Sequence, residues 1–265
     1  MTARCYDWAT LSHQALSALD LRDAVAVLPL GATEQHGGHL PLSTDTDIAE
    51  GLFAAAVERV ADDLTLLRLP TLTIGASAEH ADFPGTLSVP AETLAATLRS
   101  VGGSVAAAGV RRLVLLNAHG GNLAAMDIAA LDLRRAHDLL VVKLHYPRLA
   151  IGPIDLPDDE LARGIHGGAV ETAMMLHLHP DRVDRAAFPA ADAPAPGMAN
   201  TPHTRVAPTG EAPFAWKASD LDACGVAGDP RRADAALGER LVADYSQAIA
   251  EVLTETAGMG WPPSA

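Results

Sequence analysis

The sequence predicts an α/β fold, a single-domain α/β/α sandwich with a mostly parallel central sheet, spanning residues 1–265. Short runs in which every side chain is apolar alternate with longer segments whose apolar residues have helical spacing, and Gly and Pro separate the two. A strand that is apolar on both faces has to be covered by helices on both sides, as in parallel sheets. A chain of 265 residues is long enough to bury such a core.

The predicted elements follow in order along the chain. Ala24–Leu30 (AVAVLPL) reads as a buried strand, and Thr46–Ala61 carries apolar residues at helical spacing. Further strands are predicted over 64–69, 112–116 and 139–144, and further helices over 91–108, 123–137, about 168–178 and 233–256. In the 123–137 helix we expect Leu131 on the buried face. Residues 186–230 are rich in Ala, Pro and Asp, which predicts a long surface excursion that serves as a lid or a subunit contact.

Composition narrows the classes of partner and compartment. The chain has 19 Lys+Arg against 33 Asp+Glu, a net charge of −14, which disfavours nucleic acid as a partner. No apolar run approaches the roughly 20 residues of a membrane span, and no signal peptide is visible, so a cytoplasmic protein is expected. Two cysteines do not make a disulfide framework, whereas 11 histidines make imidazole and carboxylate the candidate metal ligands. Those ligands favour zinc, manganese or iron.

The first polar motif follows the first predicted strand. Glu34 and His36 point the same way in extended backbone, because side chains repeat every second residue, and Asp45 returns soon afterwards. A Glu and a His at this spacing can each bind one of two adjacent metal ions, with Asp45 bridging the two ions. The alternative is a capped, solvated loop before the 46–61 helix.

Two further motifs lie at later predicted helix starts. His119 stands in the stretch Asn117–Asn122, whose glycines permit a tight turn and close approach of a ligand. A phosphate loop is the rival interpretation, but no Gly-Lys-Ser/Thr follows. His166 and Glu171 form the third motif; His166 is a candidate general acid/base, and Glu171 is either a ligand or a first-turn residue that complements the helix dipole.

Together the three motifs supply two His, one Asp and two Glu as ligands, with one His to spare. This set is typical of a dinuclear centre that polarises a carbonyl and activates water, and hence of hydrolysis.

The strings LPLGATEQHGGHLPLSTDTDIA, EHADFPGTLSV, LVLLNAHGGN and HGGAVETAMML, in that order, resemble the creatininase family of metal-dependent amidohydrolases. The resemblance covers about residues 24–180, and the stretch 225–230 also looks familial. It implies an α/β/α sandwich, two divalent metal ions per chain, hydrolysis of amide-type C–N bonds and a homohexamer. By the same resemblance Glu34, Asp45 and His119 would hold one metal, His36, Asp45 and Glu171 would hold the other, and His166 would be catalytic. Zinc is the first expectation, with manganese or iron as alternatives.

The sequence also departs from the family pattern. Creatininase proper has Tyr-Glu where this chain has Gly120-Gly121, and it has tryptophans at the positions of Ala162 and, near the fourth predicted strand, Pro147. Without that aromatic clamp creatinine is not the expected substrate. Members with the Gly-Gly-Asn form include a formamide deformylase and a peptidase that trims a peptide precursor, and the sequence does not choose between these and another small amide.

Two other function classes stay open at this point. A dinuclear phosphoesterase uses similar metals but needs Arg or Lys beside them, and only Arg163 lies in the motifs. A non-catalytic, ring-forming metal-binding protein is disfavoured because His166 and all five ligand residues are present. His39 and His80 are expected either to support the site as hydrogen-bond donors or to lie in solvent-facing loops.

Overall fold

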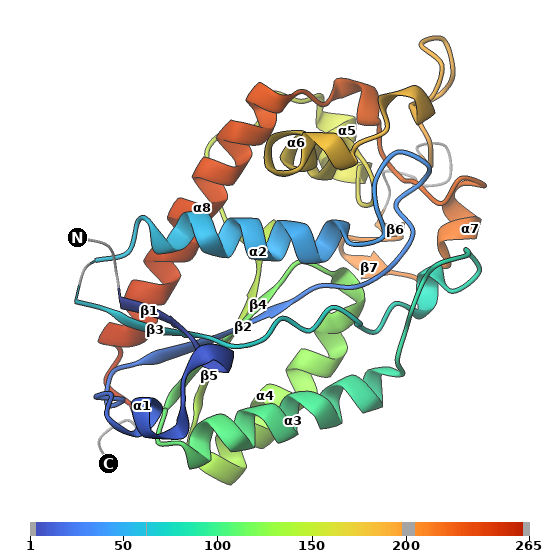
Figure 1. Cartoon of the computed structure of the whole chain (residues 1–265). Helices are drawn as coiled ribbons and strands as arrows, with labels where there is room; N and C mark the ends of the chain where they lie inside the picture. Colours follow the sequence, from blue (N-terminus) through green and yellow to red (C-terminus); the bar gives the residue numbers. More distant parts are fainter. Residues whose placement is uncertain (1–3, 62, 198–204, 262–265) are drawn as a thin grey trace.

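The computed structural model describes residues 4–61, 63–197 and 205–261 and has a five-stranded sheet at its centre (Figure 1). The strands lie in the order β1-β3-β2-β4-β5 and all pairs are parallel. Their bounds are Arg4–Asp7 for β1, Val25–Leu30 for β2, Thr65–Arg68 for β3, Arg112–Asn117 for β4 and Leu140–His145 for β5. The α/β class with a mostly parallel sheet is therefore confirmed.

Helices cover both faces of the sheet (Figure 1). One face carries α2 (Thr44–Val57), α6 (Ala169–Leu178) and α8 (Ala235–Gly258), and the other carries α3 (Ala91–Ala107) and α4 (Leu123–His137). Shorter helices are α1 (His13–Ser17), α5 (Asp158–Arg163) and α7 (Ala218–Leu221). Alternate residues of β2 and β4 belong to the two cores: Val27 and Val114 face α2 and α8, whereas Leu28 and Leu115 face α3 and α4.

Three details differ from the sequence prediction. The edge strand β1 was not predicted, because its four residues are largely exposed and lack an apolar run. Helix α2 begins at Thr44, two residues before the predicted start, and ends at Val57. Leu131 was placed wrongly on the buried face of α4: its side chain is 62% exposed, while Leu133 on the same helix is buried.

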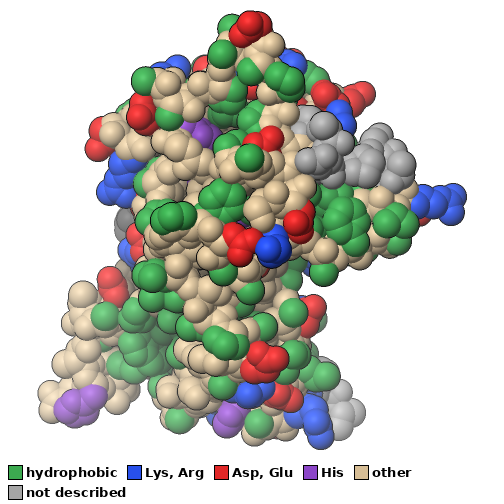
Figure 2. Space-filling view, turned by 90° about the vertical axis from the view of Figure 1, so that its right-hand side faces the viewer, with side chains coloured by type: hydrophobic (Ala, Val, Ile, Leu, Met, Phe, Trp, Pro, Cys, Tyr) green, Lys and Arg blue, Asp and Glu red, His purple; other side chains and the backbone are tan. Residues whose placement is uncertain are grey.

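The predicted excursion at 186–230 contains little regular structure. Its described part has the 3-10 turn Arg185–Ala187, the short pair β6 (Val206–Ala207) and β7 (Ala212–Pro213), and α7. Lys217 and Ser219 at its end contact Asp82, so the excursion is tied to the loop before α3. On the face drawn in Figure 2, Lys and Arg side chains lie apart from one another and form no basic patch. Of the helices in the described ranges, none combines the length and apolar character of a membrane span.

The strand order explains where the polar motifs meet. The chain leaves β2 towards β3 on one side and leaves β4 towards β5 on the other, so β2 and β4 flank the point where the winding reverses. Ligand sites of open parallel sheets form at the carboxyl ends of such a strand pair. Leu30 at the end of β2 pairs with Asn117 at the end of β4, which brings the segments after both strands together.

Close packing of α8 on α6 supports a stability test. A Cβ on Gly238 would lie 1.9 Å from the carbonyl oxygen of Ala173 in α6, a distance at which the helices must move apart. We expect Gly238→Ala to lower the free energy of unfolding by about 1–3 kcal/mol, despite the better helix propensity of Ala. Gly258→Ala, on the same helix in open space, is the matched control and should not destabilise. Urea denaturation of both variants measures this; equal stability of the two would contradict the packing argument.

Candidate metal centre

The three sequence motifs converge at the carboxyl ends of β2 and β4. Glu34 and His36 follow β2, and His119 lies two residues after the end of β4. Asp45 lies in the first turn of α2, and Glu171 lies in the first turn of α6. His166 lies three residues before the start of α6 and is held by a β-bridge to Ala227. All five predicted ligands and His166 thus lie in one site.

A first group of potential ligands comprises Glu34, Asp45 and His119, whose donor atoms lie within 4.8 Å of one another. His119 Nδ1 lies 3.2 Å from Glu34 Oε1 and 3.2 Å from Asp45 Oδ2. All three side chains are buried. An imidazole between two carboxylates is a ligand set that suits a zinc-like cation.

A second group comprises His36, Asp45 and Glu171. His36 Nε2 lies 3.3 Å from Asp45 Oδ1 and 3.9 Å from Glu171 Oε2. Asp45 therefore belongs to both groups and presents a different oxygen to each. A third possible group joins Glu34, His36 and His166, so the geometry also allows His166 as a ligand.

Backbone carbonyls orient the three imidazoles. His36 Nδ1 faces the carbonyl of Glu34 at 3.1 Å, and His119 Nε2 faces the carbonyl of Ala76 at 3.0 Å. His166 Nε2 faces the carbonyl of Gln35 at 2.7 Å. Because a carbonyl only accepts, each of these ring nitrogens carries the proton. In the neutral rings the other nitrogen then presents its lone pair to the carboxylates, as in metal-binding histidines.

The carboxylates of this cluster favour a positive charge in their midst. Burial by itself would lower the pKa of His36, but Asp45, Glu171 and Glu34 raise it to about 9. Burial would likewise lower the pKa of His119, but Glu34 and Asp45 raise it well above its ordinary value. The pKa of Asp45 is lowered: burial opposes this, but both histidines favour its ionised form. Two protons on His36 and His119 thus hold positive charge that a divalent cation could supply instead.

Two buried atoms in the cluster test whether a metal fits. Within the described residues, His36 Nε2 and Asp45 Oδ2 are both buried and lack a hydrogen-bond partner. Such atoms carry a cost unless something binds them. Both point into the two ligand groups, so the donor set fits divalent cations.

Sequence reasoning missed part of the support around the ligands. Ser77 donates a short hydrogen bond to Glu34 Oε2, and nothing in its local sequence signals this contact, which joins residues 43 positions apart. Gln35 stands inside the first motif; its amide donates to Gly225 O at 2.8 Å and to His80 Nδ1 at 2.9 Å. His80 in turn directs Nε2 at Glu34 Oε1, 3.6 Å away.

His39 and His80 are buried, so the solvent-facing alternative is wrong for both. His39 Nε2 donates to the carbonyl of Gly167, the residue after His166. Burial lowers the pKa of His39 to about 4 and that of His80 to about 4, so both rings are neutral at pH 7. They support the site through hydrogen bonds, as expected of outer partners of a metal centre.

Glu79 lies beside Gly121, the second of the two positions that depart from the family pattern. A Cβ on Gly121 would lie 2.5 Å from Glu79 Oε1, 2.5 Å from His119 Nε2 and 2.1 Å from the carbonyl oxygen of Ala76. Glu79 Oε1 lies 3.6 Å from His119 Nε2. In this chain the space that a side chain at 121 would need is therefore filled by a carboxylate from another segment.

A cavity of about 850 Å³ opens on the ligands. Glu34, Asp45 and Glu171 lie in its wall, and so do Ala162 and Pro147, the positions without the expected tryptophans. Trp216 lines it from the excursion, with its ring edge-to-face on His80 at 6.2 Å. Among the described lining residues Arg148 is the single Arg or Lys, and Arg163 is not in the wall.

Comparison with known proteins identifies the family. A family model described as creatininase, creatinine amidohydrolase, matches residues 9–253. The chain belongs to the creatininase family. Membership makes this chain a hydrolase of carbon–nitrogen bonds, as its four motifs imply.

Curated relatives and solved structures agree with this family. A mycofactocin precursor peptide peptidase of Mycobacterium tuberculosis (strain ATCC 25618 / H37Rv) is 36% identical over 244 residues, 88% of this creatininase-family chain and 87% of the relative. A creatinine amidohydrolase of Pseudomonas putida is 36% identical over 178 residues, 61% of this chain and 67% of the relative. A structure described as creatininase with Mn superposes with a TM-score of 0.72 at 27% identity and covers 98% of this chain and 100% of its own.

Proposed function

We propose that this chain hydrolyses a peptide-like amide with two divalent cations held by Glu34, Asp45 and His119 and by His36, Asp45 and Glu171. The observation that carries the proposal is Asp45, which offers one carboxylate oxygen to each ligand group, while His36 Nε2 and Asp45 Oδ2 have no hydrogen-bond partner among the described residues. A shared carboxylate is the usual bridge of dinuclear hydrolases. The whole chain is proposed to act as one domain.

Zinc is proposed for both positions, with manganese or iron as alternatives. Imidazole and carboxylate ligands suit all three ions. One related structure is described as creatininase with Mn, and a creatininase mutant is described as of Zn–Zn type. When bound, such cations polarise an amide carbonyl and activate water.

The volume of the cavity and the curated relatives both favour a peptide-like substrate over creatinine. The cavity of about 850 Å³ lies in the upper part of the range for small-molecule sites, which accommodates a peptide segment. The mycofactocin precursor peptide peptidases match 82–88% of this chain, a larger share than the creatinine amidohydrolase. With Arg148 as the single cationic side chain among the described lining residues, the wall offers little to hold a phosphoester.

His166 is proposed to transfer a proton to the leaving nitrogen. Its Nε2–H is held by the carbonyl of Gln35, so Nδ1 faces the centre, 3.7 Å from Glu34 Oε1. Burial, together with the nearby His36 and His80, lowers the pKa of His166 well below its ordinary value. The ring is therefore neutral at pH 7 and able to take up a proton at Nδ1 before delivering it.

Activity against a panel of formamides, cyclic amides, dipeptides and phosphoesters tests the proposed function. Cleavage of dipeptides that is lost on removal of metal by a chelator and restored by Zn²⁺ or Mn²⁺ would support it. Cleavage of phosphoesters alone would establish the competing metallophosphoesterase, and failure on every class together with retained metal would favour a non-catalytic metal-binding protein.

Creatinine should be hydrolysed poorly or not at all. Ala162 and Pro147 line the cavity where creatininase has aromatic side chains, so the flat ring of creatinine loses its clamp. Turnover measured by product formation should fall far below the ordinary enzyme range of about 1–1,000 s⁻¹. Turnover inside that range would contradict this prediction; Trp216 or Phe214 would then have to rebuild the clamp, which Trp216→Ala and Phe214→Ala would reveal.

A cytoplasmic homohexamer is proposed for the assembled protein. The proposal rests on the resemblance to the family and, for the compartment, on the two exposed free cysteines. Light scattering coupled to size-exclusion chromatography would measure the mass, and a monomer at micromolar concentration would overturn the hexamer.

A further inference from the structure

Tyr146 brings an unpartnered hydroxyl to the wall of the cavity. It follows β5 directly and begins the 3-10 turn Tyr146–Arg148. The residue is only 2% exposed, it lines the cavity, and its hydroxyl makes no hydrogen bond to any described residue. Its hydroxyl is not one of the fully buried atoms that lack a partner, so it is open to the cavity. A tyrosine hydroxyl at the wall of a substrate cavity is placed to meet a ligand.

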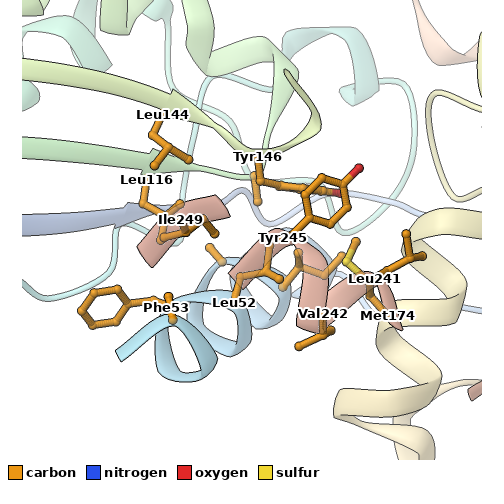
Figure 3. Close-up of a cluster of buried hydrophobic side chains, with 14 of the residues drawn as sticks. Leu52, Phe53, Leu116, Leu144, Tyr146, Met174, Leu241, Val242, Tyr245 and Ile249 are labelled. Atoms are coloured by element: carbon orange, nitrogen blue, oxygen red, sulfur yellow. The ribbon is translucent and has the colours of Figure 1, made fainter. Parts of the chain in front are cut away.

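The ring of Tyr146 is held rigidly. It meets the ring of Tyr245 edge to face, with centroids 5.0 Å apart and an interplanar angle of 82°. Both belong to the core cluster that includes Leu144 and Leu241 (Figure 3). Because packing fixes the ring, the hydroxyl keeps its position without support from a hydrogen bond. A fixed donor loses little freedom when a charge develops beside it.

Carboxylates of the metal centre lie near this hydroxyl. Burial raises the pKa of Tyr146 well above its ordinary value, and the negative charges of Glu171 and Asp45 and the neighbouring Tyr245 add to the effect. The group is therefore a neutral phenol at any physiological pH, and so a donor. Tyr245 differs: burial alone raises the pKa of its hydroxyl, with no contribution from a carboxylate. Both phenols line the cavity together with Asp45 and Glu171, but these carboxylates raise the pKa of Tyr146 alone.

We propose that the hydroxyl of Tyr146 donates a hydrogen bond to the carbonyl oxygen of the scissile amide as negative charge develops on that oxygen. This inference rests on the proposed amide hydrolysis. Water oxygen bonds to the carbonyl carbon as His166 Nδ1 takes a proton from it, and the carbonyl electron pair moves to oxygen, where Tyr146 stabilises it. The pair then re-forms the carbonyl as the C–N bond breaks, and His166 delivers a proton to the departing nitrogen. The phenolic proton stays on Tyr146 throughout.

Tyr146→Phe tests the inference with Tyr245→Phe as the matched control. Each variant removes from the same ring pair one hydroxyl that makes no hydrogen bond to a described residue, so neither should lower the melting temperature or the metal content. With the amide of the panel that the wild type cleaves fastest, we expect Tyr146→Phe to lower kcat about 100-fold with little change in KM. Tyr245→Phe should keep kcat within about twofold of the wild type, since no carboxylate of the centre acts on its hydroxyl.

The outcomes separate this inference from the proposed function. If the wild type cleaves no amide, the proposed function fails and the role of Tyr146 fails with it. If the wild type is active and Tyr146→Phe retains its kcat, only the role of Tyr146 is overturned. Equal losses in both variants would also overturn it, because packing of the ring pair rather than one hydroxyl would then matter.

Discussion

Asp45→Ala should remove more metal than any other single substitution in the chain. Asp45 is shared by both ligand groups, whereas Glu34, His119, His36 and Glu171 each serve one of the two proposed metal positions. Loss of the shared carboxylate weakens both positions at once, so turnover should fall by about a thousandfold or more, the several kcal/mol that a metal centre contributes. Elemental analysis of protein purified without chelator gives the metal content, and kinetics on a cleaved amide give the rate.

Asp47→Ala is the matched control for this experiment. Asp47 lies in the same first turn of α2, but its carboxylate faces Arg182 and Ser43 instead of the centre. The control should keep both metals and most of its activity; because Asp47 is buried in its ion pair with the half-exposed Arg182, its melting temperature is measured alongside. Two metals per chain in Asp45→Ala, or only trace metal in the wild type even after reconstitution, would overturn the dinuclear proposal.

His166→Ala should keep both metals and the oligomer but lose about 100- to 10,000-fold in hydrolytic rate. The five other residues complete two ligand groups without it, and proton transfer by a positioned group is worth a factor of this size. His177→Ala, an exposed histidine on α6, is the control and should behave as the wild type. Metal content and kcat are measured on the same preparations.

Two other results for His166→Ala are informative, because each would change the role proposed for a residue. Loss of one metal would make His166 a ligand, through its group with Glu34 and His36, and Glu171 would then be the residue assigned wrongly. Full activity would mean either that the metal-activated water acts alone or that another histidine moves the proton. His80 is the first candidate because its ring lies 4.1 Å from that of His166, and His39 is the second.

The fold and the proximity of the candidate ligands could be predicted because they depend on local patterns. Buried strands such as β2 and β4 are continuous apolar runs, and their motifs begin where the runs end. The pairing of Leu30 with Asn117 then follows from ordinary parallel register. Edge strand β1 could not be predicted, because an exposed strand needs no apolar run in its sequence.

The supporting contacts could not be predicted because they join distant segments. Ser77 reaches Glu34, and Gln35 reaches Gly225 across 190 positions, without any local signal. Tyr146 reads in the sequence as one more apolar residue after a strand. It is distinguished by its packing on Tyr245 and by its place in the cavity wall, where its hydroxyl has no hydrogen bond to a described residue. The position of Glu79 beside Gly121 likewise could not be predicted, because it depends on how two distant segments pack.

The position of α8 has a consequence for how the enzyme matures in the cell. The helix packs on α2, which carries Asp45, and on α6, which carries Glu171, and its residues Leu241 and Ile249 belong to their common core. A ribosome makes α8 after every other element around the centre. Until that helix emerges, neither supporting helix has its full buried surface. If Asp45 and Glu171 hold metal as proposed, a nascent chain without α8 would carry both ligands on helices whose buried faces are incomplete, so metal binding would follow synthesis of the last helix.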